Sequence, residues 1–512
     1  MTHMRINVFS YLEESARAYP EKTAIADDKT SLTFREWHQM ALSIGTAIFE
    51  SCGGCVRKPV LVFVDRTIDG LPGFMGVVAS ANFYVPIDSR MPASRIKLIV
   101  DILSPVAALA VTAKDRSVLE SIGFAGNIVD MHEASLCTAK PEALTALRDR
   151  LIDLDPVYSI FTSGSTGVPK GVVVSHRGMI DLSEWLAATL GITDKDSLGN
   201  QTPFYFDGSV KDICLCLKTG ATLHVIGRKY FTFPKLLIEF LDSREITAIL
   251  WATSAITLVG NSGILDVRIP QHVRLVTFAG EAMPAKQLNV WMERLPEARF
   301  VNLYGPTEIT VDCTYHEVKR KYPDDTFIPI GRACRNMEVL VLDETGDLVE
   351  QGETGELCVR GTGVALGYFG DRDKTCEVFV QNPLNPYYND IIYRTGDLVR
   401  YSEEGDLIFV SRKDSQIKHM GNRIELGEIE AAVNALDKVL NAACVFDSGE
   451  DKIVLFYETC DRSDMDIVNM ISERLPKYMY PNVCIRRDTM PYNLNGKIDR
   501  LELKRIYEAG KA

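Results

Sequence analysis

The chain has 512 residues, 46% of them hydrophobic, and its 69 Asp and Glu residues outnumber its 56 Lys and Arg residues. This length is too great for one ordinary domain, and the hydrophobic fraction allows large buried cores and excludes gross disorder. The formal net charge of −13 argues against bulk electrostatic binding to nucleic acid or to an anionic membrane. The N-terminal segment has no apolar signal core, and no stretch reaches the roughly 18 uninterrupted apolar residues of a membrane span. We therefore expect no membrane insertion and a cytoplasmic location.

Short apolar segments alternate with helical patterns from about residue 5 to residue 281. Residues 58–65 are typical of a buried strand, residues 70–88 of a helix followed by a strand, and residues 95–105 of a helix that ends at Ser-Pro. Further strand patterns follow at 107–113, 171–176, 221–227, 246–253 and 273–281. This alternation predicts an α/β fold of mostly parallel sheets covered by helices.

The pattern changes beyond about residue 325. Residues 337–361 show short strands joined by Gly-containing turns, which is typical of an antiparallel β subdomain. Residues 405–436 hold a strand, a charged break and an amphipathic helix, and the last hundred residues suit a small α+β domain. We predict a large N-terminal domain over residues 1–412 and a small C-terminal domain over residues 413–512.

The twelve cysteines are scattered along the chain, and Cys52 and Cys55 form a CxxC motif. No second CxxC with a His or Cys partner lies at zinc spacing. We interpret the cysteines as free buried thiols of a reducing compartment. The alternative is a redox or metal role for Cys52 and Cys55.

A glycine-rich and hydroxyl-rich loop lies in "FTSGSTGVPKGVVVSH" (161–176). Glycines let the backbone approach phosphate oxygens closely, hydroxyls add donors, and Lys170 adds a compact positive charge suited to a polyphosphate. The Walker A template fails, because Gly171 follows the lysine and Pro169 precedes it. The loop thus predicts a triphosphate site of another kind.

The segment "TSGSTGVPKG" (162–171) resembles the signature loop of the adenylate-forming ligases, which include acyl-CoA synthetases, luciferases and the adenylation domains of nonribosomal peptide synthetases. Motifs similar to those of the amino-acid-activating branch follow in family order over nearly the whole chain. They are "LTFREW" (32–37), "ANFYVPIDSRMPASRI" (81–96), "FDGSV" (206–210), "NLYGPTE" (302–308), "GETGELCVRGTGVALGYF" (352–369), "YRTGDLVR" (393–400), "RKDSQIKHMGNRIELGEIE" (412–430), "LPKYMYP" (475–481) and "NLNGKIDR" (493–500).

The resemblance implies a reaction in two halves. ATP and a carboxylate give an acyl-adenylate and pyrophosphate, and the acyl group then passes to a thiol. Charge builds up on the α-phosphate in the first half, so a cation and Mg²⁺ should converge there. By resemblance, Lys497 is the catalytic cation, Thr307 contacts the α-phosphate and Glu308 holds the metal.

The remaining nucleotide contacts are also implied by the resemblance. Tyr304 would stack on adenine and Asn302 would hydrogen-bond its edge, while Asp397 would accept the ribose hydroxyls with help from Arg412. The loop would hold the phosphates, with Lys170 and Thr166 on the β- and γ-phosphates. Its predicted members are Thr162, Ser163, Gly164, Ser165, Thr166, Gly167 and Lys170.

In this family the small domain swings about a hinge between the two half-reactions. Asp414 stands where the resemblance puts that hinge. The swing would present Lys497 for the first half-reaction and the segment around Gly421 for the second.

Asp207 in "FDGSV" indicates which acid is activated. The amino-acid branch carries an aspartate here that pairs with the substrate ammonium group, and a buried carboxylate needs such a cationic partner. The alternative is a structural Asp at a helix start. Alignment with the family gives the other pocket positions as Gly208, Lys211, Leu250, Thr277, Ala279, Leu303, Val311 and Asp312.

Two alternatives for the substrate side chain remain, and they depend on whether Lys211 pairs with Asp312. If they pair, the pocket is small and suits alanine, glycine or serine; if Lys211 points away, a basic side chain fits Asp312. We favour a small amino acid.

The predicted enzyme is a monomeric amino acid–carrier protein ligase that uses ATP and Mg²⁺. The resemblance includes the D-alanine–carrier protein ligases, and the receiving thiol would be the phosphopantetheine arm of a separate carrier protein. The chain ends shortly after "NGKIDR", so we expect a free-standing ligase or an excised domain of a larger synthetase. The alternatives are an acyl-CoA ligase for a simple carboxylic acid and a non-catalytic nucleotide-binding scaffold.

Overall fold

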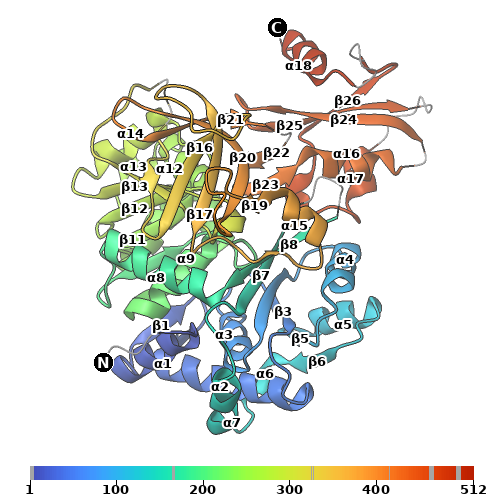
Figure 1. The fold of residues 1–512 in the computed structure, drawn as a ribbon. Helices are drawn as coiled ribbons and strands as arrows, with labels where there is room; N and C mark the ends of the chain where they lie inside the picture. Colours follow the sequence, from blue (N-terminus) through green and yellow to red (C-terminus); the bar gives the residue numbers. More distant parts are fainter. Residues whose placement is uncertain are drawn as a thin grey trace. The chain divides into compact units, whose positions relative to one another are not determined.

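The computed structural model describes residues 5–163, 168–324, 326, 328–413, 416–436, 438–459, 466–491 and 498–511. Its contacts divide the chain into two compact units. The large unit comprises Met1–Ser89, Leu103–Ile160 and Gly171–Lys413, and the small unit comprises Arg90–Ile102, Phe161–Lys170 and Asp414–Ala512. Figure 1 shows the elements of both units in sequence colours. The predicted α/β class is confirmed, because the chain forms two large sheets whose central strands are parallel.

A seven-stranded sheet has the order β18-β8-β7-β4-β3-β5-β6. Neighbouring strands from β7 through β6 in this order pair in parallel, as the alternating apolar and helical patterns predict. The strands are β3 (Pro59–Val64), β4 (Phe83–Asp88), β5 (Ala107–Ala110), β6 (Asn127–Asp130), β7 (Pro156–Thr162), β8 (Lys170–Ser175) and β18 (Gly367–Tyr368). The helices near these strands in the sequence are α3 (Leu71–Ala79), α4 (Ala93–Leu103), α5 (Ala113–Ser121), α6 (Met131–Ser135) and α7 (Pro141–Arg148).

A nine-stranded sheet has the order β15-β14-β13-β12-β11-β9-β10-β1-β2. Its six central strands are parallel, and β14, β15 and β2 pair antiparallel at the edges. The strands are β1 (Thr23–Ala26), β2 (Ser31–Thr33), β9 (Ser197–Asn200), β10 (Thr222–Val225), β11 (Ala248–Ala252), β12 (Leu275–Ala279), β13 (Arg299–Tyr304), β14 (Thr314–Val318) and β15 (Arg332–Ala333). Associated helices are α10 (Arg228–Thr232), α11 (Pro234–Ser243), α12 (Thr253–Asn261), α13 (Ile264–Val267) and α14 (Ala285–Arg294).

The predicted antiparallel subdomain is a five-stranded sheet in which every pairing is antiparallel. Its strands are β16 (Met337–Leu342), β17 (Gly355–Gly361), β19 (Phe379–Gln381), β20 (Ile391–Tyr401) and β21 (Leu407–Arg412), with the short helix α15 (Arg372–Val378) between β18 and β19. In β20 and β21 the register brings Asp397 opposite Arg412.

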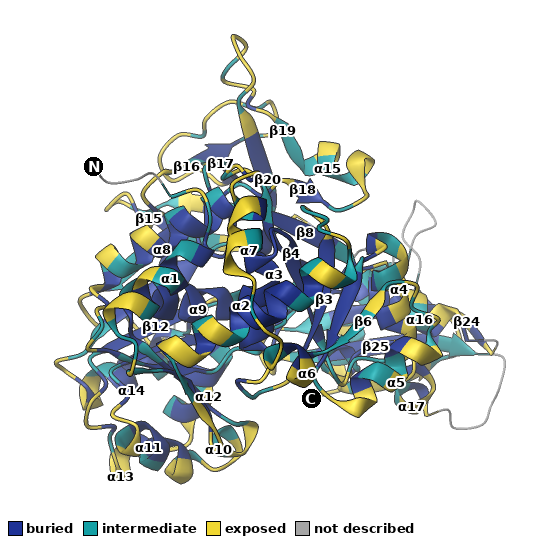
Figure 2. Ribbon diagram, turned by 90° about the horizontal axis from the view of Figure 1, so that it is seen from below, coloured by how far each residue is buried: buried dark blue, intermediate teal, exposed yellow. Residues whose placement is uncertain are grey.

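The core of the large unit contains side chains of both parallel sheets and of the helices between them. Helix α3 is buried along its whole length and appears dark blue throughout in Figure 2. It packs on α2 (Phe34–Ser51). Helices α8 (His176–Leu190) and α9 (Gly208–Thr219) lie side by side, in green in Figure 1, and α1 (Phe9–Ala18) packs on α9. Hydrophobic burial of this kind is the main stabilising contribution.

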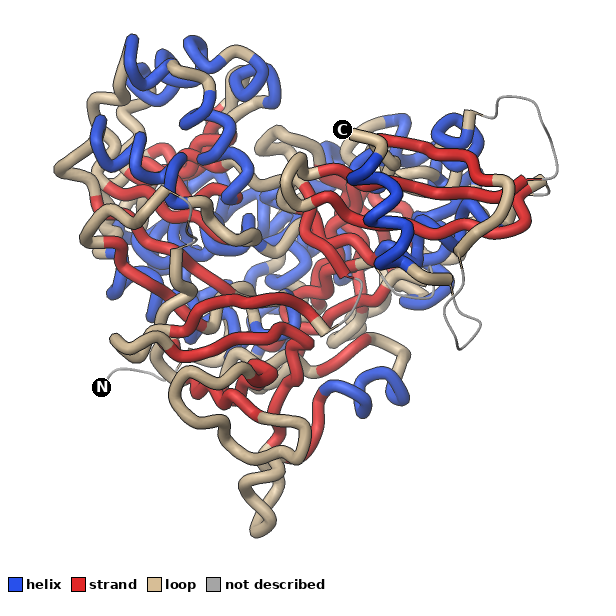
Figure 3. The backbone as a smooth tube through the Cα atoms, turned by 90° about the horizontal axis from the view of Figure 1, so that it is seen from above, coloured by secondary structure: helices blue, strands red, loops and turns tan. Residues whose placement is uncertain are grey.

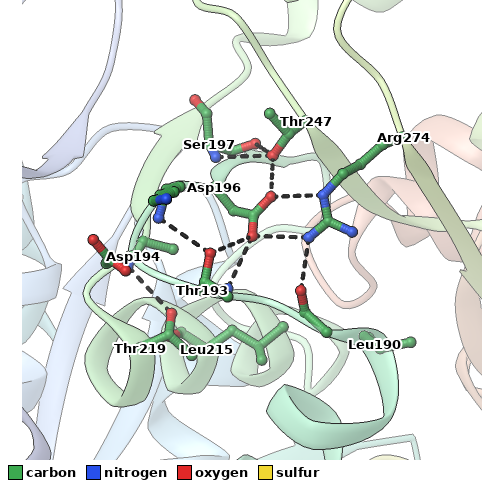
Figure 4. A network of polar contacts seen from close by, with 12 residues as sticks. Leu190, Thr193, Asp194, Asp196, Ser197, Leu215, Thr219, Thr247 and Arg274 are labelled. Atoms are coloured by element: carbon green, nitrogen blue, oxygen red, sulfur yellow. Dashed lines mark hydrogen bonds and ion pairs between the residues drawn. The ribbon is translucent and has the colours of Figure 1, made fainter.

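A polar network lies at the amino ends of three strands of the nine-stranded sheet (Figure 4). The Asp196 carboxylate, just before β9, accepts hydrogen bonds from Arg274 Nε at 2.9 Å and from Thr247 Oγ1 at 2.7 Å. Thr247 precedes β11 and Arg274 precedes β12. Burial alone would raise the pKa of Asp196, but the hydrogen bonds from Arg274 and Thr247 hold it below its ordinary value. The network therefore joins three strands through one ionised carboxylate.

The small unit contains the sheet β24 (Val439–Asp447), β25 (Lys452–Thr459) and β26 (Val483–Arg487), with α16 (Leu426–Asn434), α17 (Ile467–Ile471) and α18 (Arg500–Ala509). Leu503 of α18 belongs to the same buried cluster as Val454 and Phe456 of β25, and α18, which contacts β24, lies beside the red strands in Figure 3. From the sequence we predicted only a charged break before α16. That segment holds a hairpin, β22 (Gln416–His419) and β23 (Asn422–Glu425), whose turn residues Met420 and Gly421 both have positive φ.

Among the helices of the described residues, none has the length and apolar character needed to cross a bilayer.

Candidate functional site

Predicted site residues of the large unit gather where parallel strands of the nine-stranded sheet end. Ala279 is the last residue of β12 and Tyr304 the last of β13, and helix α9 begins directly after Asp207. In parallel α/β sheets, the carboxyl ends of the strands form the usual ligand-binding edge. This edge is opposite to the one that carries Asp196.

Tyr304, Asp397 and Arg412 form one buried polar group. The Tyr304 hydroxyl donates to Asp397 Oδ2, and Arg412 Nη1 donates to Asp397 Oδ1. Burial first, and then the Asp397 charge, hold the pKa of Tyr304 well above its ordinary value, so this hydroxyl keeps its proton. The three residues come from β13, β20 and β21, and their assembly matches the grouping that the motifs predicted for adenine and ribose.

Asn302 lies two residues before Tyr304 on β13 and is buried. Its Nδ2 donates to the Pro329 carbonyl at 2.8 Å. Its Oδ1 is buried and accepts no hydrogen bond from any described residue. A buried acceptor without a donor is costly, so a ligand amino group at this position would satisfy it.

Glu308 and Thr307 lie on the short 3₁₀ helix Thr307–Ile309 that follows β13. The Glu308 carboxylate is fully buried and accepts a hydrogen bond from the Tyr368 hydroxyl at 2.7 Å. Hard carboxylate oxygens suit Mg²⁺, which commonly uses one or two protein carboxylates together with substrate phosphates. Among the described residues no group of three His, Cys, Asp or Glu side chains could hold a metal.

The described ends of the predicted phosphate loop are Thr162, Ser163 and Lys170, and Gly164, Ser165, Thr166 and Gly167 lie outside the described residues. Within the small unit, Ser163 Oγ donates to the Arg423 carbonyl at 2.9 Å and accepts from the Glu425 amide at 3.2 Å. Lys170 Nζ lies 4.0 Å from Glu425 Oε1. A phosphate that binds Ser163 therefore has to replace two hydrogen bonds to β23.

Asp207 is the N-cap residue of α9, but its side chain makes no capping hydrogen bond. A structural Asp at a helix start would accept one from the first turn. The side chain is half-buried. Gly208 follows, and a Cβ there would meet the Thr202 side chain at 3.3 Å. The Asp207 carboxylate is thus not used to cap the helix that it precedes.

Lys211 and Asp312 form an ion pair in the interior of the large unit. Lys211 Nζ lies 3.4 Å from Asp312 Oδ2 and 3.5 Å from Asp312 Oδ1. The two residues are only 3% and 2% exposed. Of the two arrangements that the sequence left open, the structure has the paired one.

The other predicted pocket residues share the strands and loop around this pair. Thr277 lies opposite Leu250 in the β11–β12 pairing, and Leu303 lies on β13. Val311 precedes Asp312 with φ 77°, after Thr310 with φ 52°. Gly305 allows this backbone to come close, because a Cβ there would lie 2.4 Å from the Val311 carbonyl oxygen. The predicted pocket positions Leu250, Thr277, Leu303 and Val311 are buried, and Ala279 is half-buried.

Besides the four loop residues named above, the predicted residues Lys497 and Asp414 also lie outside the described residues. The cysteines of the described chain are free, and Cys52 and Cys55 are half-buried.

The sequence analysis missed three residues at or near this site. Tyr368, the partner of Glu308, lies inside one of the family motifs but was not singled out there. Glu356, inside the same motif, accepts a hydrogen bond from Lys413 Nζ at 3.1 Å, next to the predicted hinge. Tyr158 of β7 is fully buried, and its hydroxyl has no hydrogen-bond partner among the described residues. No sequence signal marks Tyr158, because it lies within an ordinary strand pattern.

The parallel sheets and the buried Tyr304–Asp397 group at their carboxyl edge define a nucleotide-binding enzyme of the α/β class. The chain belongs to the AMP-binding enzyme family, whose sequence profile matches residues 12–369. The predicted membership of the adenylate-forming ligases is confirmed, and the use of ATP follows from it.

Several relatives of known function are similar over almost the whole chain. D-alanine–D-alanyl carrier protein ligase of Bacillus velezensis is 31% identical, with 96% of this chain and 97% of that protein covered. Zwittermicin A synthase ZmaJ of Bacillus cereus is 31% identical over 95% of this chain and 93% of its own length. Tyrocidine synthase 1 of Brevibacillus parabrevis is 30% identical over 97% of this chain, which spans only 45% of that relative.

Solved structures share the fold. The Vibrio cholerae adenylation domain AlmE in complex with glycyl-adenosine-5′-phosphate superimposes with a TM-score of 0.83 at 23% identity, covering 99% of both chains. PA1221, a protein containing adenylation and carrier domains, gives a TM-score of 0.83 at 24% identity over 98% of this chain and 84% of its own.

Proposed function

We propose that this protein activates a small amino acid as its aminoacyl-adenylate, with release of pyrophosphate, and then transfers the aminoacyl group to the phosphopantetheine thiol of a carrier protein. The observation that carries the proposal is Asp207, whose carboxylate is not used to cap α9. It lies one helical turn before the buried Lys211–Asp312 pair. A carboxylate so placed is suited to an α-ammonium group.

In the first half-reaction a carboxylate oxygen of the amino acid attacks the α-phosphorus of ATP, and pyrophosphate leaves. Lys497 would neutralise the charge that develops at the α-phosphate, and Thr307 would donate its hydroxyl there. Tyr304 and Asn302 would bind the base, and Asp397 with Arg412 the ribose. Mg²⁺ held by Glu308 supplies further charge neutralisation when it is bound.

The loop would bind the outgoing phosphates through its backbone N–H groups, its hydroxyls and Lys170. In the second half-reaction a thiolate attacks the acyl carbon and AMP leaves. We propose that the small C-terminal domain, residues 413–512, turns about Asp414 between the two steps.

Three further features belong to the proposal. The carrier protein is a separate partner, as the name of the D-alanyl carrier protein ligase indicates for that relative. The enzyme works as a monomer in the cytoplasm, where ATP is available. It binds no nucleic acid, because the net charge of −13 disfavours such a partner.

The test is ATP–pyrophosphate exchange against the twenty standard amino acids, D-alanine, β-alanine and ornithine. We expect strong exchange with one small amino acid and its loss in Asp207→Ala. The matched control is Asp149→Ala, which removes an exposed carboxylate at the C-terminal end of α7 and should leave exchange unchanged. Exchange with a plain carboxylate that survives Asp207→Ala would favour an acyl-CoA ligase. Absence of all exchange would favour a nucleotide-binding scaffold.

A further inference from the structure

The C-terminal segment of the small unit, Asp414–Ala512, continues from the large unit at the peptide bond after Lys413. Lys413 is the last residue of the large unit, and it directly follows β21. Its backbone N–H donates to the Gly396 carbonyl at 2.8 Å, and its Nζ donates to Glu356 Oε2 at 3.1 Å. One backbone bond and one side-chain bond therefore hold the residue from which this segment starts.

The acceptor of the backbone bond lies in an irregular stretch of β20. The register of the β17–β20 pairing shifts between Glu356 and Cys358, which is the mark of a bulge. Gly396 lies in this bulge with φ 73°, a conformation that glycine adopts without strain. Its N–H donates to Glu356 Oε1 at 3.1 Å. Gly396 thus donates to Glu356 and accepts from Lys413.

Glu356 is the side chain on which these bonds converge, and it is only 4% exposed. Arg394 Nε donates to Oε2 at 2.9 Å, the same oxygen that accepts from Lys413. Burial alone would raise the pKa of Glu356, but the hydrogen bonds from Arg394 and Lys413 hold it below its ordinary value. A buried, ionised carboxylate that accepts hydrogen bonds from three residues is held firmly in position.

This arrangement adjoins the buried Tyr304–Asp397 group. Asp397 lies opposite Arg412 in the β20–β21 pairing, and the neighbouring residues Gly396 and Lys413 are joined by the backbone bond. The same two strands therefore carry both the proposed ribose acceptor and the start of the proposed hinge. Within the large unit, the position of one is fixed relative to the other.

We infer that Glu356 is a positioning residue that fixes the start of the hinge, so that the rotation of the small domain is confined to the chain after Lys413. The inference rests on the proposed function, in which that domain turns about Asp414. Each half-reaction needs one orientation of the domain, and a fixed starting point restricts the orientations that it samples. Because a displacement of about 1 Å can cost roughly 100-fold in rate, a loosely held starting point would slow the chemistry. The nucleotide contacts of the large unit would keep their affinity.

Lys413 and Arg394 offer a matched pair of variants. Both donate to Glu356 Oε2, and their side chains are similarly exposed, at 38% and 42%, but only Lys413 borders the hinge. Lys413→Met should lower the kcat of ATP–pyrophosphate exchange about 5- to 20-fold and leave the KM for ATP within about twofold of the wild type. Arg394→Met should keep kcat within about twofold, and Lys413→Arg, which retains the charge, should restore most of the lost rate.

Cleavage by endoproteinase Asp-N gives a readout that does not depend on activity. This protease cuts before aspartate, so a cut at the hinge releases a fragment that begins at Asp414 and is identified by its mass. Cleavage of the native protein follows how often the segment opens. Lys413→Met should release the fragment at least about three times faster than the wild type, and Arg394→Met should match the wild type.

Glu356→Gln is a second route to the same loss. It keeps an acceptor for the Gly396 amide and removes the ion pair with Lys413, so it should raise the cleavage rate and lower kcat as Lys413→Met does. In the double variant the two effects should not add, because both substitutions remove one interaction. Additive effects would mean that Glu356 and Lys413 act separately, and would overturn the inference.

Each remaining outcome decides a separate question. Absence of exchange with any amino acid rejects the proposed function, and the cleavage rates then still decide whether Glu356 holds the start of the hinge. Wild-type kcat and cleavage in both Lys413→Met and Glu356→Gln overturn the inference and leave the proposed function standing. Equal losses in Lys413→Met and Arg394→Met, or a loss confined to the KM for ATP, give Glu356 a structural role only and also overturn it. Should Glu356→Gln not fold, the variants of the exposed Lys413 still decide the question.

Discussion

The Tyr304 hydroxyl donates a hydrogen bond to the Asp397 carboxylate, although 93 residues separate the two in the chain. The other oxygen of the carboxylate is held by Arg412. The two donors therefore fix the position of the Asp397 side chain, and a ribose diol would meet an acceptor that is already oriented.

Asp397→Asn should raise the KM for ATP roughly 10- to 100-fold, because hydrogen bonds to a charged acceptor are the strong ones. Tyr304→Phe removes only the hydroxyl and keeps the ring, so its KM for ATP should stay within about threefold of the wild type. Initial rates over a range of ATP concentrations measure both. An unchanged KM in Asp397→Asn would argue against the ribose role.

Glu308→Gln should lower exchange about 10²- to 10³-fold and move the Mg²⁺ dependence to higher concentration, because a neutral amide is a poor ligand for Mg²⁺. Binding of AMP without metal, measured by calorimetry, should change little. Tyr368→Phe is the control, since it keeps the carboxylate and removes only its hydrogen-bond donor. Equal Mg²⁺ titrations in wild type and Glu308→Gln would exclude Glu308 as the metal ligand.

Lys497→Ala should slow adenylate formation about 10²- to 10³-fold, as the loss of one charge-stabilising group does elsewhere. Loading of the carrier protein from preformed aminoacyl-adenylate should remain near the wild-type rate, because that step does not form charge on the triphosphate. Rapid-quench measurements separate the two steps. A loss of both would mean that Lys497 acts throughout or supports the structure.

Asp196→Asn should destabilise the fold by about 1–3 kcal/mol without altering the KM for ATP, because the network lies at the edge of the sheet opposite to the site. The pKa of Asp196 is below its ordinary value in the folded state, so the unfolded state binds the proton first on acidification. Its stabilising contribution is present above about pH 4 and is lost as the pH falls through the lower folded pKa. Thermal melting of both proteins should show the full difference at pH 7 and a smaller difference at pH 3.5, which shrinks further at lower pH.

Asp212 should have the opposite pH dependence. Burial raises its pKa to about 7. Between about pH 4 and pH 7 the folded state holds a proton that the unfolded state has released, so stability falls as the pH rises through this window. Asp212→Asn can still accept from Asn200, and it should match the wild type near pH 4 and melt higher at pH 8. If wild type and variant differed in melting temperature by the same amount at every pH in this range, the raised pKa of Asp212 would be contradicted.

Much of this fold follows from local patterns in the sequence. The buried strands and their alternating helices are continuous apolar or periodic segments, and the site motifs lie where these strands end. The β22–β23 hairpin was missed because its alternation is masked by charged residues. Its turn depends on the left-handed conformation of Met420, which no simple rule predicts.

The pairing of Lys211 with Asp312 could not be decided from sequence for a different reason. It joins residues 101 positions apart, and the distance between them depends on two side-chain conformations and on the backbone at Val311. Tyr158 was missed because a tyrosine in a buried strand looks like ordinary packing. The motif identified Asp207 as a candidate, but only the structure shows that its side chain makes no capping hydrogen bond.

Thr310 and Val311 are consecutive non-glycine residues with positive φ, the second of them β-branched. Side chains resist this conformation, and surrounding structure has to hold it in place. Replacing Val311 by glycine would relieve the backbone strain and widen the pocket. The position of Asp312, the next residue, would then be held less firmly. Directed evolution toward larger substrates should therefore reach them more readily through Leu250 or Leu303, which lie on regular strands, than through this strained bend.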